Sequence, residues 1–182
     1  MKKIKIGDET YRVSSDDTYL DNMGYEFEPY MVQLFRSLIT PNDVVADIGA
    51  NIGLTAILFS SLAKKTFAFE PSPSTYRFLS KNLALNKINN VETINCGLGE
   101  EKQTLSITFA KTNRSGGFVS NKFRIETGHV TEEIQIDFID NFFLGKKELP
   151  TFIKIDVEGF ELDVIKGGLK FLQANQPVVV ME

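Results

Sequence analysis

Short apolar runs alternate with helical patterns of apolar residues along much of the chain. Runs near residues 44–48 and 66–70 are typical of buried strands, and helical spacing follows each of them. Residues 91–95 predict a third strand. A helix is also predicted from Glu28-Pro29 to about residue 39, and one from about Ser74 to Asn86. Successive strand and helix units favour parallel strands with right-handed crossovers. The pattern therefore predicts an α/β fold with a doubly wound, mostly parallel sheet.

The N-terminal segment has a different pattern. Residues 4–13 alternate apolar and polar side chains around Gly7-Asp8-Glu9, which predicts a short hairpin. A polar loop with Asp16, Asp17 and Asp21 follows, and its spacing fits a solvated turn better than a calcium loop. We therefore expect an N-terminal hairpin and loop over residues 1–27, followed by the main domain over residues 28–182.

The middle of the chain alternates like an antiparallel sheet. Residues 103–110 and 132–138 predict two strands of an insertion between the third and fourth units. A polar loop rich in glycine and serine lies between them and contains His129, the only histidine. Such a loop either shapes a substrate pocket or only connects strands, and a lone loop histidine more often faces solvent.

The last two predicted strands cover residues 152–156 and 178–182. The second of them would lie at an open edge of the sheet, because no further strand is predicted before the chain ends at Glu182. An open edge would expose apolar side chains and unpaired backbone groups. We therefore expect self-association through this strand.

Composition narrows the class of protein. The 182 residues are 42% hydrophobic, enough for one sizeable core. A net charge of -4 argues against a nucleic acid partner. The single cysteine, Cys96, excludes an internal disulfide and favours a reducing compartment, so a cytoplasmic location is expected. No apolar run approaches the length of about 18 residues that a membrane span needs.

The loop after the first strand carries the strongest chemical signal. It reads Asp47-Ile48-Gly49-Ala50-Asn51-Ile52-Gly53. Glycines let the backbone turn sharply and let a ligand approach closely, and free N–H groups at the start of the next helix face that ligand. Two glycines alone are weak evidence, because helix packing also selects small residues. The acid at the strand end strengthens the prediction of a small-molecule site.

Acidic residues also end the second and fourth strands. Glu70 lies 23 residues beyond Asp47, a spacing typical of an acid that binds ribose hydroxyls, although an acid at a helix start would look the same. Asp156, Glu158 and Glu161 follow the fourth strand. They indicate either a polar site beside a reacting centre, with Lys154 as their local partner, or a helix start that favours acids.

Three segments together resemble the FkbM family of S-adenosylmethionine-dependent methyltransferases. They are DIGANIG (47–53), FEPSPSTYRFLSKNLALN (69–86) and FIKIDVEGFELDVIKGG (152–168), and the resemblance covers about residues 28–182. It implies a Rossmann-like fold, which in class I methyltransferases usually continues past the fifth strand into a helix and an antiparallel strand pair that this chain lacks after Glu182. It also implies O-methylation of a hydroxyl on a sugar or natural product. The implied cofactor contacts are Asp47, Gly49, Asn51 and Gly53 around the methionine part, Glu70 at the ribose, Gly97 and Leu98 at the adenine, and Asp156 near the sulfonium.

An aliphatic hydroxyl attacks a methyl group only if its proton leaves. Asp156 and Glu158 are the candidates for this role, either as the base or as ligands of a divalent cation such as Mg²⁺.

Two other functions stay open. A nicotinamide-dependent oxidoreductase is disfavoured, because no tyrosine is followed by lysine four positions later. A non-catalytic binding module on the same fold would show no turnover.

Overall fold

A five-stranded parallel sheet forms the centre of the computed structural model, which describes residues 1–120 and 128–182. Its strands are β3 (Val44–Ile48), β4 (Lys65–Phe69), β5 (Val91–Ile94), β10 (Phe152–Ile155) and β11 (Val178–Met181). Their order is β11-β10-β3-β4-β5, so the chain winds outward from β3 in both directions. The predicted doubly wound sheet is confirmed.

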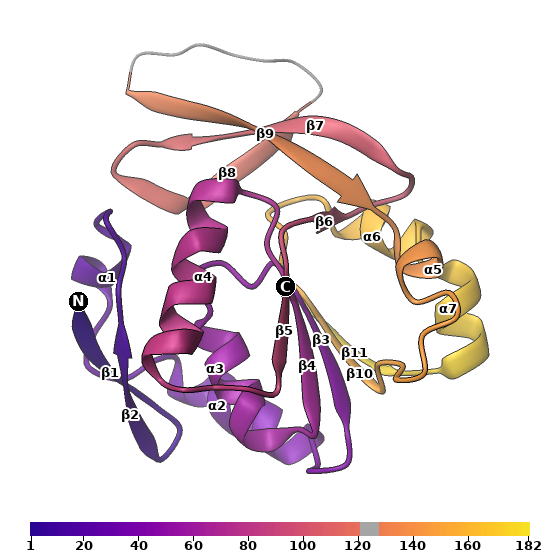
Figure 1. The fold of residues 1–182 in the computed structure, drawn as a ribbon, viewed down its shortest axis with the longest axis horizontal. Helices are drawn as coiled ribbons and strands as arrows, with labels where there is room; N and C mark the ends of the chain where they lie inside the picture. Colours follow the sequence, from indigo (N-terminus) through magenta and orange to yellow (C-terminus); the bar gives the residue numbers. More distant parts are fainter. Residues whose placement is uncertain (121–127) are drawn as a thin grey trace.

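Helices cover both faces of this sheet (Figure 1). On one face lie α2 (Pro29–Leu38), α3 (Leu54–Leu62) and α4 (Pro73–Leu85); on the other lie α5 (Ile139–Phe142), α6 (Glu161–Lys166) and α7 (Leu169–Asn175). The first core includes Phe35 packed edge-on against Phe59, with ring centroids 4.9 Å apart. The second includes Phe67 and Phe143, 5.4 Å apart. Alternate residues of the buried strands thus supply two separate cores.

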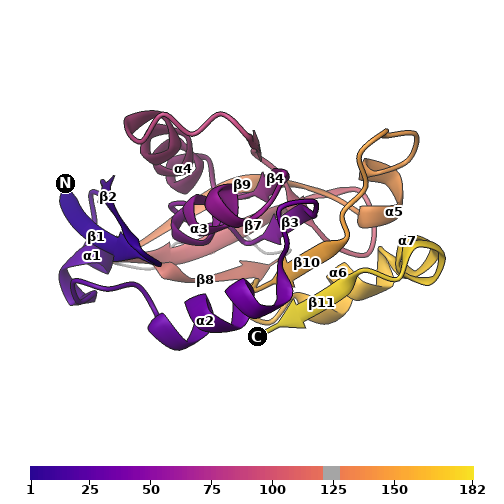
Figure 2. The ribbon, with the colours of Figure 1, turned by 90° about the horizontal axis from the view of Figure 1, so that it is seen from below.

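The predicted N-terminal hairpin is present as β1 (Lys2–Ile6) and β2 (Glu9–Val13). It lies at the opposite end of the molecule from α5 and α7 (Figure 2). Asn82 of α4 holds its end, because the side-chain oxygen accepts the Ser14 N–H at 2.8 Å and the amide donates to the Ser14 carbonyl at 3.1 Å. The predicted polar loop differs in one respect: Tyr19–Asn22 forms a short helix, α1, which buries Leu20. The division of the chain at residue 27 stays a prediction.

The insertion forms a second sheet, with the order β6-β9-β7-β8, above the parallel strands in Figure 1. Its strands are β6 (Gly97–Leu98), β7 (Gln103–Ala110), β8 (Asn113–Ser120) and β9 (His129–Asp137). The antiparallel pairing of β7 with β9 was predicted, but two details were wrong. Residues 113–120 form a strand rather than a loop, and His129 begins β9 opposite Ala110. Pairing with β7, not local sequence preference, holds this polar segment extended.

The strand β11 borders the parallel sheet and pairs with β10. Val178 and Met181 on it are 47% and 56% exposed. Self-association through this edge stays a prediction. Within the described ranges, no helix is long and apolar enough to cross a membrane.

Candidate active site

The glycine loop reverses the chain directly after β3. Gly49 has φ 83°, a left-handed conformation that favours glycine. The N–H groups of Gly49 and Ala50 both donate to the Phe69 carbonyl, at 3.1 and 2.9 Å. A Cβ at Gly49 would lie 1.9 Å from the carbonyl oxygen of Asp156. Only glycine therefore allows the ends of β3 and β10 to approach this closely.

The second glycine of the loop serves packing. Gly53 has φ 96° and precedes α3, and a Cβ there would lie 2.7 Å from Cδ1 of Leu79 on α4. Between the two glycines, Asn51 also has a positive φ of 50°, and its side-chain oxygen accepts the Ile52 N–H at 2.8 Å. The loop therefore packs against α4, and its backbone lines the cavity at the carboxyl ends of the strands.

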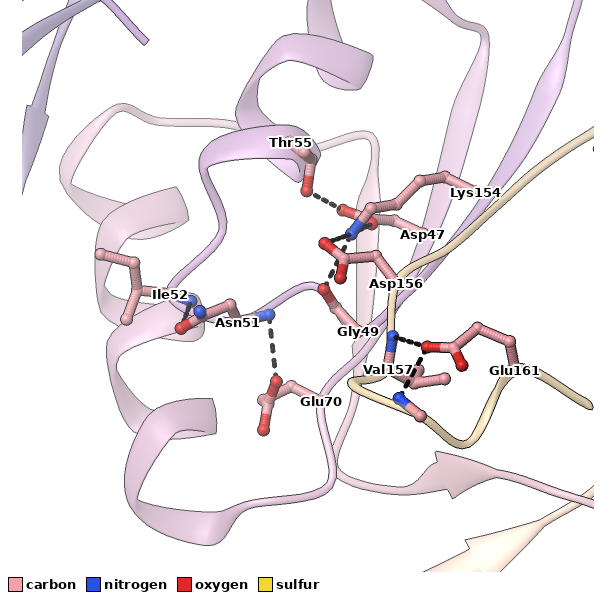
Figure 3. Close-up of polar contacts among 11 residues, drawn as sticks. Asp47, Gly49, Asn51, Ile52, Thr55, Glu70, Lys154, Asp156, Val157 and Glu161 are labelled. Carbon is pink, nitrogen blue, oxygen red and sulfur yellow. Dashed lines mark hydrogen bonds and ion pairs between the residues drawn. The ribbon is translucent and has the colours of Figure 1, made fainter. Parts of the chain in front are cut away.

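A buried lysine ties this loop to two strands (Figure 3). The Lys154 ammonium lies 3.1 Å from Asp156 Oδ2 and 3.4 Å from Asp47 Oδ1, and it donates to the Gly49 carbonyl at 3.0 Å. Burial lowers the pKa of Lys154, but the two carboxylates outweigh it and the net pKa is raised. Lys154 therefore stays charged and holds β3, β10 and the glycine loop together.

The Asp47 carboxylate is fully buried behind the loop. Thr55 donates to its Oδ2 at 2.6 Å, while Lys154 faces its other oxygen. Burial raises the pKa of Asp47, and Lys154 and Thr55 oppose that rise. The sequence indicated Lys154 as a partner of the acids after β10, but it did not predict that Lys154 also pairs with Asp47. The available signal was a lone lysine within the apolar strand Phe152–Ile155.

Glu70 follows β4 and is 6% exposed. One carboxylate oxygen accepts the Asn51 N–H at 3.0 Å and the other accepts the Ser72 N–H at 2.9 Å. Burial raises the pKa of Glu70 to about 7, although these two N–H groups oppose the rise. Ser72, not Glu70, is the N-cap of α4, because its Oγ accepts the Thr75 N–H at 3.2 Å. Each Glu70 oxygen retains a lone pair for a further donor.

A cavity of about 290 Å³ lies at the carboxyl ends of the strands. Its wall includes seven of the residues selected from the sequence, namely Gly49, Asn51, Glu70, Gly97, Leu98, Asp156 and Glu158. Asp47 and Gly53 are not among the residues that line the cavity. Asp47 instead pairs with Lys154, and Gly53 packs closely against Leu79. The insertion supplies Ile107, Gly117, Val119 and Ile136, so it shapes the pocket rather than only connecting strands. The sequence did not indicate the N-terminal wall, formed by Tyr19, Phe27, Glu28 and Met31.

The three acids after β10 have different surroundings. Asp156 pairs with Lys154. Glu161 accepts the N–H groups of Val157 and Gly159 at 3.3 and 2.9 Å, so it belongs to the start of α6. Glu158 lines the cavity with φ 53°; burial and the nearby charge of Asp156 raise its pKa. Asp156 and Glu158 are thus the two members of the group that reach the cavity.

The structure lends no support to a divalent cation at these acids. Among the described residues, no group of three or more histidine, cysteine, aspartate or glutamate side chains is placed to hold a metal ion. The ammonium of Lys154 already forms an ion pair with Asp156.

Most of this chain matches a known protein-domain family. The methyltransferase FkbM domain family matches residues 47–182, which contain the glycine loop, Glu70 and the Lys154 and Asp156 pair. This chain belongs to the FkbM family of S-adenosylmethionine-dependent methyltransferases. The membership decides against the oxidoreductase and favours an enzyme over a non-catalytic module.

Individual proteins that are similar to this chain agree with the family match. Methyltransferase 1 of Beauveria bassiana is 31% identical over 92% of this chain and 75% of its own length. The hexuronic acid methyltransferase AglP of Haloferax volcanii is 30% identical over 84% of this chain and 61% of its own length. Among solved structures, the FkbM methyltransferase of Methylobacillus flagellatus has a TM-score of 0.55 and 19% identity over 81% of this chain. This FkbM-family chain spans only 36% of that protein.

Proposed function

We propose that this FkbM-family chain transfers a methyl group from S-adenosylmethionine to a hydroxyl on a sugar or small natural product. The observation that carries the proposal is one cavity on which the glycine loop, Glu70 and the Asp156 and Glu158 pair converge. A similar protein, AglP, is named as a hexuronic acid methyltransferase, which supports a sugar acceptor.

The residues of the cavity suit the parts of this cofactor. Glu70 has lone pairs for the two ribose hydroxyls, because its backbone partners use only one per oxygen. Gly97 and Leu98 are buried and line the cavity, where adenine would lie against them. The backbone of Gly49 and Asn51 borders the space for the methionine part, and Asp156 would face the sulfonium. When bound, the cofactor supplies an electrophilic methyl group, which the acceptor oxygen takes as the carbon–sulfur bond breaks.

The protein's own chemical task is to remove the proton of the acceptor hydroxyl. Glu158 is the better proton acceptor, because its raised pKa brings it closer to neutral pH than an ordinary glutamate. Asp156 is held in place by Lys154 and would orient the hydroxyl toward the methyl group.

The variants Asp156→Asn and Glu158→Gln test these roles. We expect Glu158→Gln to lower turnover by roughly 10²–10⁴-fold because it removes the base. Asp156→Asn should also lower turnover, because the acceptor hydroxyl is no longer oriented. In both variants the affinity for S-adenosylhomocysteine should change far less. The acceptor is first found by a methyl-transfer screen over sugars, hexuronic acids and hydroxylated metabolites. Asp163→Asn is the control, because that carboxylate pairs with Lys166 on α6. Wild-type turnover by both site variants would remove these residues from the mechanism.

A further inference from the structure

The inserted sheet meets the wall of the cavity through one carboxylate. Glu132 on β9 accepts the Ser72 hydroxyl at 2.7 Å and the Ser74 N–H at 3.3 Å. Ser72 and Ser74 are 1% and 6% exposed and Glu132 is partly buried, so the contact is partly shielded from water. A charge-assisted hydrogen bond in such surroundings holds its two elements in fixed register.

The same serine also holds Glu70. The Ser72 N–H donates to Glu70 at 2.9 Å, and the other oxygen of Glu70 accepts the Asn51 N–H. A continuous series of contacts therefore runs from Glu132 through Ser72 and Glu70 to the glycine loop. Its members come from three segments that are distant in the sequence.

This series lies next to the part of the cavity that the insertion covers. Ile136 and Val119 line the cavity from the insertion, while Glu70 and Ser72 line it from the segment after β4. The insertion packs its apolar side chains in a small cluster apart from the two cores of the parallel sheet. The turn between β7 and β8 makes another contact, in which the Thr18 N–H donates to the Thr112 carbonyl at 2.8 Å. That contact joins the insertion to the start of α1 and does not involve Glu70.

We propose that Glu132 is a positioning residue that holds the inserted sheet over the adenosine half of the cofactor cavity and fixes Glu70 through Ser72. The inference rests on the proposed function. It assigns the insertion a part in binding adenosine-containing ligands, in addition to any contact with the acceptor.

The charge of Glu132 gives the proposal an independent readout. Two charged groups act on Glu70: Glu132 from β9 raises its pKa, and Lys154 from β10 lowers it. Removal of the Glu132 charge should therefore lower the pKa of Glu70. If binding needs ionised Glu70, the midpoint of its pH dependence moves to lower pH.

Isothermal titration with S-adenosylhomocysteine and with adenosine tests this inference. We expect Glu132→Ala to weaken both ligands about tenfold, the effect of losing one hydrogen bond to a charged group. The control is Glu133→Ala, the neighbouring residue on β9, whose exposed side chain points away; it should bind like the wild type. Glu132→Gln retains an acceptor oxygen, so it should bind more tightly than Glu132→Ala and move the midpoint below that of the wild type.

Equal affinities of Glu132→Ala and Glu133→Ala for both ligands would overturn the positioning role while leaving the cofactor site in place. If Glu132→Ala does not fold, an unchanged pH midpoint in Glu132→Gln would overturn it. Failure of the wild-type chain to bind S-adenosylhomocysteine would instead overturn the proposed function, and the inference with it.

Discussion

Lys154→Met should lower the free energy of unfolding by about 3–5 kcal/mol, because it leaves a buried carboxylate without its counter-charge. Asp47 is fully buried, and Lys154 is the cation beside it at 3.4 Å. Methionine fills a similar volume, so the lost charge accounts for most of the effect. Denaturant unfolding at neutral pH measures the difference between the variant and the wild type.

The double variant Asp47→Asn with Lys154→Met separates charge from packing. It removes both charges, so we expect it to be more stable than Lys154→Met alone. Lys166→Met is the matched control, because Lys166 is exposed and pairs with Glu100 at the surface; it should change stability little. A Lys154→Met variant as stable as Lys166→Met would contradict a structural role for the buried pair.

Gly49→Ala should lower the free energy of unfolding by more than about 3 kcal/mol, through the combination of backbone strain and a steric clash. The backbone at Gly49 has φ 83°, and a Cβ would lie 1.9 Å from the Asp156 carbonyl. The loop or the end of β10 must move to relieve the contact. We therefore also expect the folded variant to lose most of its affinity for S-adenosylhomocysteine.

Gly145→Ala isolates the part of this effect that comes from the backbone. Gly145 has φ 74°, but no atom lies within 4 Å of a Cβ built there. Its substitution should lower the free energy of unfolding by only about 1–2 kcal/mol. The same denaturant unfolding measures both variants. Equal decreases in the free energy of unfolding for Gly49→Ala and Gly145→Ala would show that the close approach of Asp156 to the loop does not affect stability.

The parallel sheet was predictable because each of its buried strands is a short apolar run, and the helices between them keep a helical period. The N-terminal hairpin was predictable from strict alternation around Gly7-Asp8-Glu9. The strand β8 was not, because a polar segment with glycine and serine carries no strand pattern of its own. It is extended only because β7 supplies its hydrogen-bond partners, and such nonlocal pairing leaves no local trace.

The candidate site was predictable where a residue ends a strand. Glu70 and Asp156 reach the cavity because the carboxyl ends of neighbouring parallel strands share one edge. The contact of Lys154 with the Gly49 carbonyl joins residues 105 positions apart, and the register of β10 on β3 creates it. The contact between Glu132 and Ser72 likewise depends on how the insertion lies over the sheet. No spacing in the sequence reveals either contact.

We expect the cavity to bind S-adenosylmethionine with Glu70 at the ribose. The most direct test is isothermal titration of S-adenosylhomocysteine into the wild type and Glu70→Ala, with NADH titrated in parallel. We predict binding to the wild type, a loss of about 1–3 kcal/mol in Glu70→Ala because hydrogen bonds to a charged group disappear, and no binding of NADH. Unchanged affinity in Glu70→Ala would contradict the ribose assignment. Binding of NADH without binding of S-adenosylhomocysteine would contradict the proposed methyl transfer from S-adenosylmethionine.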